Sequence, residues 1–224
     1  MWLCETGRVE FSARTWGRLV EAAGVERRHR AGAELLVQGA PPTHVLLLIS
    51  GRVKVAYRSA EGKVLLLAVR GERELLGSMG VLTGRPRSAS VIAMRECVTR
   101  TLMADRFRSL TRGSDLEAEL LQGAFARITE GEAWRADIAG LAAGPRLARA
   151  LLRLAGPGDG GGPVGEVHLS QTEIGQAIGL SRAVVAGELA GLRRAGVVVT
   201  ENGRVLIIDP SMLRKLAGSG HGAV

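Results

Sequence analysis

Short apolar runs separated by turn-forming residues dominate the first half of the chain. Between Val25 and Met103 they recur at 34–38, 44–50, 52–58, 63–69, 89–93 and 97–103. Each run has the length of a β-strand, and glycines such as Gly51 and Gly62 lie between them. Regular short strands with turn signals predict a small barrel or sandwich. The apolar stretches at 45–50 and 64–69 have the length of buried strands.

Helical patterns flank this β region. They predict a helix over 11–23, a short helix over 104–111 and one long helix from Asp115 to about Ala142. Ser114 and Glu117 have the spacing of a capping box at the start of the long helix.

The apolar positions of the long helix are predicted to lie near one face: Leu116, Leu120, Phe125 or Ala124, Ile128 and Trp134. Such a helix often pairs with its twin as a coiled coil, and we expect residues 113–143 to form a homodimer. The alternative is a single helix packed on the β domain. Three glycines weaken the helix, each by roughly 1 kcal/mol relative to alanine.

Residues 170–192, SQTEIGQAIGLSRAVVAGELAGL, predict two short helices joined by a tight turn at Gly179. Ser170 and Glu173 form a capping box for the first helix, and Ser181 caps the second. The apolar face of the first helix is expected from Ile174, Ala177 and Ile178, and that of the second from Val184, Val185, Leu189 and Leu192.

The outward positions of the second helix are Arg182, Ala183, Ala186 and Gly187. In a helix-turn-helix the second helix lies in the major groove of DNA. The alternative is an ordinary αα-hairpin within an all-α core.

A β-hairpin is predicted after this motif. Gly196 ends the second helix, and apolar runs flank Asn202-Gly203, a favoured two-residue hairpin turn. A helix-turn-helix followed by a hairpin is a winged helix. Arg204, beside the turn, is expected either to contact a DNA phosphate or to remain a solvated charge. Before the motif, residues 146–155 predict a helix and residues 156–165 a flexible glycine-rich loop.

Composition agrees with a polyanionic partner. The chain has 224 residues, enough for two domains, a net charge of +8 and a pI of about 10.8. From Gly144 onward there are nine basic and six acidic residues, so the excess is not concentrated in the winged helix. Neither a signal peptide nor a membrane-spanning stretch is recognisable, and we expect a cytoplasmic protein without a membrane partner.

Residue patterns typical of catalytic or metal-binding sites are not recognisable in this sequence. Cys4 and Cys97 provide neither a disulfide framework nor metal-ligand spacing, and Cys97 is expected to be a small core residue. Nucleophile elbows and paired catalytic carboxylates are not recognisable. We therefore expect a protein that is not an enzyme and has neither catalytic residues nor a metal site.

Two motifs carry a family resemblance. EIGQAIGLSRAVV (173–185) and LLGSMGVLTGRPRSASV (75–91) resemble the helix-turn-helix and the phosphate-binding cassette of the cyclic-AMP receptor protein / FNR (CRP/FNR) superfamily of bacterial transcription regulators. The resemblance implies an α+β fold. It comprises an N-terminal β-roll of the cyclic-nucleotide-binding type (1–112), a long dimerisation helix (113–143) and a C-terminal winged helix-turn-helix (144–224).

In this family backbone N–H groups and one guanidinium hold a cyclic phosphate. The matching effector-site residues are Gly77, Ser78, Met79, Arg87 and Ser88. The chain departs from the pattern, however. Ser78 stands where cyclic-nucleotide binders carry the glutamate that accepts from the ribose.

A second departure lies in the long helix. In the cyclic-AMP binders of this family the long helix supplies a Thr-Ser pair to the adenine. The nearest positions in this chain are Gly131 and Glu132, with Thr129 close by. We therefore do not expect cyclic AMP as the effector, which leaves another nucleotide or anion. Two cysteines are too few for an iron–sulfur sensor, and His29, His44, His168 and His221 lie in no recognisable haem motif.

The second helix of the helix-turn-helix also departs from the family pattern at the positions that contact DNA bases. Arg182 matches the first arginine of the cyclic-AMP receptor protein, whereas Ala183 and Gly187 replace its glutamate and second arginine. We expect a half-site other than TGTGA, read through fewer hydrogen bonds. The predicted DNA contacts are Ser170, Gln171, Ser181, Arg182, Ala183, Ala186, Gly187 and Arg204.

The sequence as a whole favours a homodimeric transcription regulator that reads a palindromic site in double-stranded DNA, with RNA polymerase as a candidate partner. The alternative is a ligand sensor that acts through protein contacts and has a non-functional winged helix.

Overall fold

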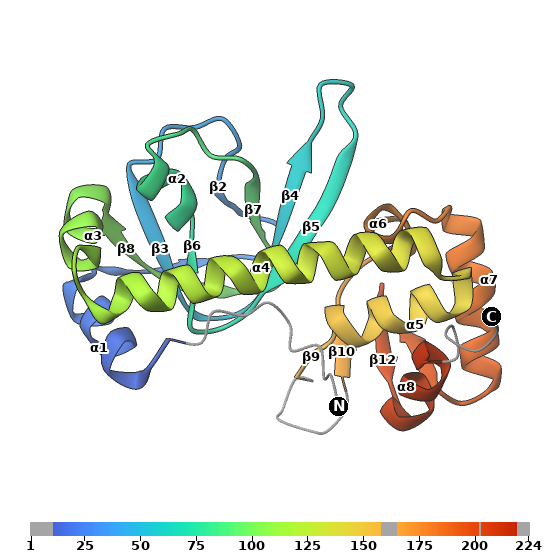
Figure 1. Ribbon diagram of the computed structural model, residues 1–224. Coiled ribbons are helices and arrows are strands. Elements are labelled where there is room, and N and C mark those ends of the chain that lie inside the picture. Colours follow the sequence, from blue (N-terminus) through green and yellow to red (C-terminus); the bar gives the residue numbers. More distant parts are fainter. Residues whose placement is uncertain (1–10, 158–164, 202, 219–224) are drawn as a thin grey trace. The chain divides into compact units, whose positions relative to one another are not determined.

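The computed structural model describes residues 11–157, 165–201 and 203–218, and the chain divides into two compact units, 1–130 and 131–224 (Figure 1). Four features predicted from the sequence lie outside the described residues: Cys4, His221, Asn202 of the hairpin turn, and residues 158–164 of the glycine-rich loop.

The first unit is a β-roll with flanking helices. Its elements are α1 (Ala13–Ala22), β1 (Glu26–His29), β2 (Glu34–Leu36), β3 (His44–Ser50), β4 (Val53–Arg58), β5 (Val64–Arg70), β6 (Glu74–Leu76), α2 (Ser78–Thr83), β7 (Ser90–Ala93), β8 (Cys97–Met103) and α3 (Ala104–Thr111). The strands form two four-stranded antiparallel sheets, ordered β1-β8-β3-β6 and β2-β7-β4-β5. All six predicted strands are confirmed. The pattern missed β6, which has three residues, and β1, whose sequence Glu-Arg-Arg-His lies at a sheet edge and is mostly exposed.

Strand β3 is buried on both faces, which explains its continuous apolar sequence. Val45 and Leu47 pack in a cluster with residues of α1 and α3, whereas Leu46 and Leu48 pack in a second cluster with residues of β4 and β7. The prediction of a second buried strand at 64–69 is wrong. β5 pairs only with β4 at the sheet edge, and Leu65 and Leu67 are exposed there.

Helix α4 (Asp115–Gly140) begins in the first unit and ends in the second. The prediction of one apolar face is wrong. Leu116 is buried and Leu120 packs on the β-roll core, whereas Phe125 and Ile128 are exposed. The residues of one helix are thus divided between two environments, which a single periodic stripe does not distinguish.

The predicted capping box of α4 is replaced by other hydrogen bonds. The Ser114 hydroxyl donates to the carbonyls of Leu110 and Thr111 at the end of α3. The Glu117 carboxylate accepts from the N–H of Gly113 at 3.0 Å. Because α3 ends immediately before α4, its last carbonyls compete for the serine.

The second unit is a winged helix. It contains α5 (Ala143–Leu154), β9 (Gly156–Pro157), β10 (Gly165–Val167), α6 (Gln171–Ile178), α7 (Arg182–Arg194), β11 (Val198–Glu201), β12 (Arg204–Ile207) and α8 (Pro210–Gly218). Its sheet has the order β11-β12-β10-β9. The predicted loop at 156–165 is corrected at both ends, since β9 pairs with β10. In the described ranges, helices that combine the length and apolarity needed to cross a membrane are absent.

Candidate functional site

The caps of α6 and α7 form as the sequence predicts. The Ser170 hydroxyl accepts from the N–H of Glu173 at 3.2 Å, and the Glu173 carboxylate accepts from the N–H of Ser170 at 2.9 Å. Gly179 has the left-handed φ of 67° that turns the chain out of α6. Ser181 then caps α7 by accepting from the N–H of Val184. The two helices and their turn are thus defined by local hydrogen bonds.

Helix α7 has one buried and one exposed face. Val185, Leu189 and Leu192 are buried as predicted, whereas Val184 is 40% exposed. Its assignment to the apolar stripe is therefore wrong. The predicted contacts Ser181, Arg182, Ala183 and Gly187 are exposed, and Ala186 is half-buried. In the part of the chain that the structure describes, the exposed Arg182 side chain forms neither a hydrogen bond nor an ion pair.

Three predicted phosphate contacts gather around one pocket. Ser170, Gln171 and Arg204 line a surface pocket of about 210 Å³, together with Leu189 of α7 and residues of β11 and β12. The structure thus brings together residues that the sequence separates by more than thirty positions. The hydroxyl and N–H of Ser170 are both engaged with Glu173, however, so Ser170 has fewer donors to offer a phosphate.

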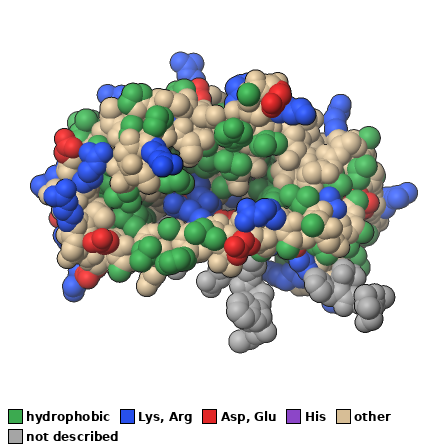
Figure 2. Space-filling model, turned by 45° about the horizontal axis from the view of Figure 1, so that its top comes forward, with side chains coloured by type: hydrophobic (Ala, Val, Ile, Leu, Met, Phe, Trp, Pro, Cys, Tyr) green, Lys and Arg blue, Asp and Glu red, His purple; other side chains and the backbone are tan. Residues whose placement is uncertain are grey.

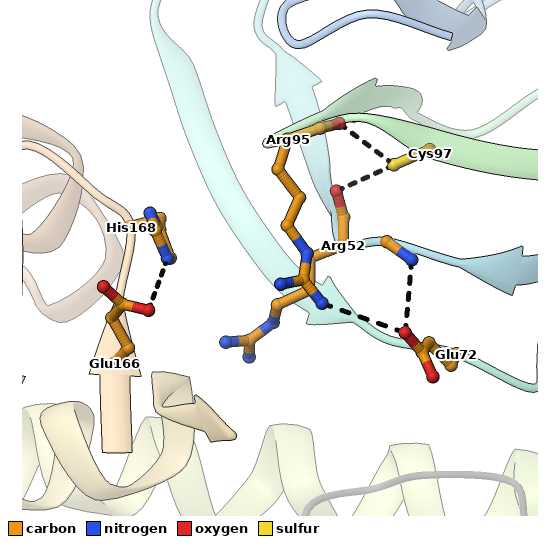
Figure 3. Close-up of polar contacts among 7 residues, drawn as sticks. Arg52, Glu72, Arg95, Cys97, Glu166 and His168 are labelled. Atoms are coloured by element: carbon orange, nitrogen blue, oxygen red, sulfur yellow. Dashed lines mark hydrogen bonds and ion pairs between the residues drawn. The ribbon is translucent and has the colours of Figure 1, made fainter. Parts of the chain in front are cut away.

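Arg204 is held by a buried acid. Its Nη1 lies 2.5 Å from Oε1 of Glu166, whose side chain is 2% exposed, and its Nη2 lies 3.8 Å from Glu201. Nε2 of His168 lies 3.0 Å from the other Glu166 oxygen (Figure 3). Arg204 is therefore an anchored side chain that remains 32% exposed.

The predicted effector cassette is arranged around Gly77 and Arg87. Gly77 precedes α2 with a left-handed φ of 79°. Arg87 is 5% exposed and donates from Nη1 to the Gly77 carbonyl at 2.7 Å and from Nη2 to the His44 carbonyl. A Cβ at Gly77 would lie 2.3 Å from Nη1 of Arg87, so only glycine permits this approach. Burial lowers the pKa of Arg87.

The other cassette residues differ in exposure. Ser78 is 5% exposed, whereas Met79 and Ser88 are exposed. Thr129 and Glu132, near the positions that the resemblance assigns to adenine, are exposed on α4. The structure thus keeps Ser78 and Arg87 buried beside the half-buried Gly77.

An ionic cluster that the sequence did not reveal joins α4 to the corner between β5 and β6. Arg70 lies 3.4 Å from Glu74 and 3.6 Å from Glu130 of α4. Arg127 lies beside them, and burial and the charge of Arg70 lower its pKa, against the opposing effect of the two glutamates. The Arg70–Glu130 pair joins segments sixty residues apart in the sequence, so no local pattern indicates it.

Cys97 is a core residue, as expected. Its thiol donates to the carbonyls of Arg52 and Arg95 at 3.3 Å, and burial raises its pKa (Figure 3). Among the described residues, groups of three or more His, Cys, Asp or Glu side chains that would hold a metal are absent. On the face drawn in Figure 2, Lys and Arg side chains are scattered among other types.

A β-roll followed by a long helix and a winged helix defines the class of two-domain DNA-binding regulators. Residues 26–114 match the cyclic nucleotide-binding domain family model, and residues 145–216 match the Crp-like helix-turn-helix domain model. The two matches together cover more than two thirds of the chain, which belongs to the CRP/FNR family of transcription regulators.

The chain is similar in sequence to characterised regulators and similar in fold to solved structures. The chain is 28% identical to the CRP-like cAMP-activated global transcriptional regulator of Mycobacterium tuberculosis, covering 83% of this chain and 85% of the relative. It is 29% identical to the cyclic AMP receptor protein of Thermus thermophilus, covering 85% and 87%. A CRP/FNR-family transcriptional regulator from the same organism has the same fold, with a TM-score of 0.70, 22% identity and coverage of 88% of this chain and 100% of that one.

Proposed function

We propose that the protein is a sequence-specific transcription regulator that reads a palindromic DNA site as a homodimer. The observation that carries this proposal is the exposed face of α7, where Arg182 begins the helix. An arginine at this place reaches a guanine edge in the major groove, which contributes roughly 1–3 kcal/mol of discrimination. Ala183 and Val184, which follow it on the exposed face, have small apolar side chains suited to a thymine methyl group.

The homodimer is supported by an apolar stripe on α4. Leu121, Phe125 and Ile128 have the spacing i, i+4, i+7 and are 57%, 59% and 56% exposed. Three large apolar side chains exposed on one helix face are costly in water and favour a twin helix as their partner. A twofold axis between two such helices would present two copies of α7 to the two halves of a palindrome.

We further propose that the cassette takes an anion or nucleotide other than cyclic AMP. Ser78 is buried beside Gly77 and has no carboxylate to accept from a ribose hydroxyl. The relative from Mycobacterium tuberculosis is a cAMP-activated regulator, and the relative from Thermus thermophilus is a cyclic AMP receptor protein. A thermal-shift screen of cyclic and linear nucleotides tests the difference. Stabilisation by cyclic AMP at low concentration would contradict the proposal.

The DNA-binding proposal is tested by in vitro selection of duplexes from a random pool with the full-length protein. The selected duplexes should be palindromic, and Arg182→Ala should weaken binding about 10- to 100-fold and relax the preference at one position of each half-site. Arg194→Ala, an exposed arginine at the other end of α7, is the matched control. It should at most weaken all duplexes equally.

The same selection distinguishes the DNA-binding regulator from the alternative function, a ligand sensor. Recovery of no preferred duplex would favour a sensor that acts through protein contacts. The proposed role as a transcription regulator also implies a cytoplasmic protein and contact with RNA polymerase at a promoter, which a pull-down with purified polymerase would test.

A further inference from the structure

The last turn of α6 leaves carbonyl groups without partners in its own helix. Gly179 and Leu180 both direct their N–H groups to the carbonyl of Gly175. The carbonyls of Ala177 and Ile178, at the end of the helix, must therefore find donors elsewhere. Since Gly179 begins the turn to α7, whatever holds these carbonyls also holds the turn.

Two side chains from outside the helix-turn-helix supply the donors. Nε1 of Trp134, on α4, donates to the Ala177 carbonyl at 2.6 Å. Nη1 of Arg146, on α5, donates to the Ile178 carbonyl at 3.2 Å. Arg146 also donates from Nε and Nη2 to the carbonyl of Leu141, at 3.2 and 2.6 Å. The arginine thus joins the segment after α4 to the end of α6.

Trp134 is itself held by a buried ionic group. The Arg153 guanidinium lies 5.4 Å from the centre of the Trp134 ring. Arg153 pairs with Asp137 at 2.9 Å, and Asp137 pairs with Arg149 at 2.5 Å. Asp137 is buried and lies between two cations, so its carboxylate is compensated on both sides and holds Arg153 in place. The indole is therefore held in one orientation.

The end of α4 also lies against the turn itself. A Cβ built at Gly179 would lie 3.5 Å from Cγ2 of Ile138. Residues 134–146 thus meet α6 through two hydrogen bonds, and Ile138 lies next to the turn. The end of α4 and the start of α5 are thus linked to the segment that connects α6 to α7.

We propose that Trp134 and Arg146 are positioning residues that fix the orientation of the reading helix relative to the end of α4. The inference rests on the proposed function, because orientation matters when two α7 helices of a dimer must meet two half-sites at a fixed spacing. Neither residue contacts DNA in this proposal. They act by fixing the angle at which α7 is presented.

The test compares Trp134→Phe with wild type on three kinds of duplex: the selected palindrome, palindromes with the spacer changed by one base pair, and a duplex with a single half-site. Phenylalanine keeps an aromatic ring over which Arg153 lies but has no N–H donor. Trp134→Phe should bind the palindrome at least about 10-fold more weakly and lose its spacer preference, whereas single-half-site affinity changes less than about twofold.

Two further variants control the result. Trp16→Phe makes the same replacement in the first unit, where the ring stacks on Phe11, and should leave all three affinities unchanged. Arg146→Lys keeps the charge but offers one nitrogen in place of a guanidinium fork, and should reproduce the loss of spacer preference.

Three outcomes overturn the inference. In the first, Trp134→Phe and Arg146→Lys retain wild-type palindrome affinity and spacer preference. In the second, single-half-site affinity falls together with the unfolding temperature, which indicates general destabilisation. In the third, wild-type protein selects no palindrome, which overturns the proposed function as well and is recognised before any variant is made.

Discussion

Nη1 of Arg87 lies 2.7 Å from the carbonyl oxygen of Gly77, so the arginine that the family resemblance assigns to a phosphate already binds the cassette backbone. A second bond to the His44 carbonyl ties the cassette to the start of β3. The side chain thus stabilises the β-roll without an effector, and an anion would have to draw the guanidinium partly away from these carbonyls.

The first prediction follows from these two bonds. Arg87→Ala should lower the free energy of unfolding of the ligand-free protein by about 2–4 kcal/mol, because two buried carbonyls lose a charged donor. Urea unfolding measures this loss. Arg85→Ala, an exposed arginine in the same loop, should change it by less than about 0.5 kcal/mol. Equal midpoints for the two variants would show that the Arg87 bonds add nothing to stability.

A second prediction concerns acid sensitivity. Burial is the main cause that lowers the pKa of both His29 and His44, with a further contribution from the charge of Arg27 at each and of Arg87 at His44. The folded state thus binds protons less readily than the unfolded state. The associated stability is fully present above the ordinary histidine pKa of 6.5 and is lost as pH falls through the lowered values.

Chemical denaturation at pH 7.5 and pH 5 (about neutral and mildly acidic) measures this effect. The wild-type protein should be less stable at the lower pH, and the double variant His29→Gln/His44→Gln should lose less stability between the two. A double variant as acid-sensitive as the wild type would assign the effect to other groups.

The third prediction tests the apolar stripe of α4. Phe125→Glu or Ile128→Glu should convert the dimer to a monomer at micromolar concentration, because a charge would be buried against the twin helix. Sedimentation equilibrium measures the change. Gln122→Glu adds the same charge at an exposed position about a quarter turn away and should leave the dimer intact. A dimer that survives both stripe variants would require another interface.

The fourth prediction concerns two glycines of the helix-turn-helix. A Cβ at Gly175 would lie 2.5 Å from the backbone carbonyl oxygen of Leu180, whereas a Cβ at Gly187 meets no heavy atom within 4 Å. Gly175→Ala should destabilise the protein by about 1–3 kcal/mol, since the backbone must shift. Gly187→Ala should stabilise α7 by up to about 1 kcal/mol. Thermal unfolding compares the two, and equal effects would contradict the close approach at Gly175.

The elements that the sequence predicts correctly are those with local signals. The capping box of Ser170 and Glu173 and the left-handed turn at Gly179 involve residues only a few positions apart, and both form as expected. The box predicted for Ser114 fails because a competing acceptor comes from the end of α3. Local spacing predicts a cap reliably only where no neighbouring element offers another partner.

Burial on a helix is less predictable than the helix itself. The pattern correctly indicates that α4 is long, yet Leu116 faces the β-roll core and Phe125 faces solvent. In α7, Val184 and Val185 are chemically alike, yet Val184 is exposed and Val185 is buried by the packing of neighbouring helices. Sequence periodicity predicts the helix, but it does not indicate which element packs against each of its apolar side chains.

The sequence by itself determined six strands of the β-roll, the long helix, the helix-turn-helix and the Arg182 position at the start of its second helix. These depend on backbone propensities, caps and turns within a few residues. Only the tertiary structure decided that Arg87 binds Gly77, that Glu166 anchors Arg204 and that Trp134 binds Ala177. These contacts join segments that are distant along the chain. A donor and an acceptor become partners there only when packing has brought them within hydrogen-bonding distance.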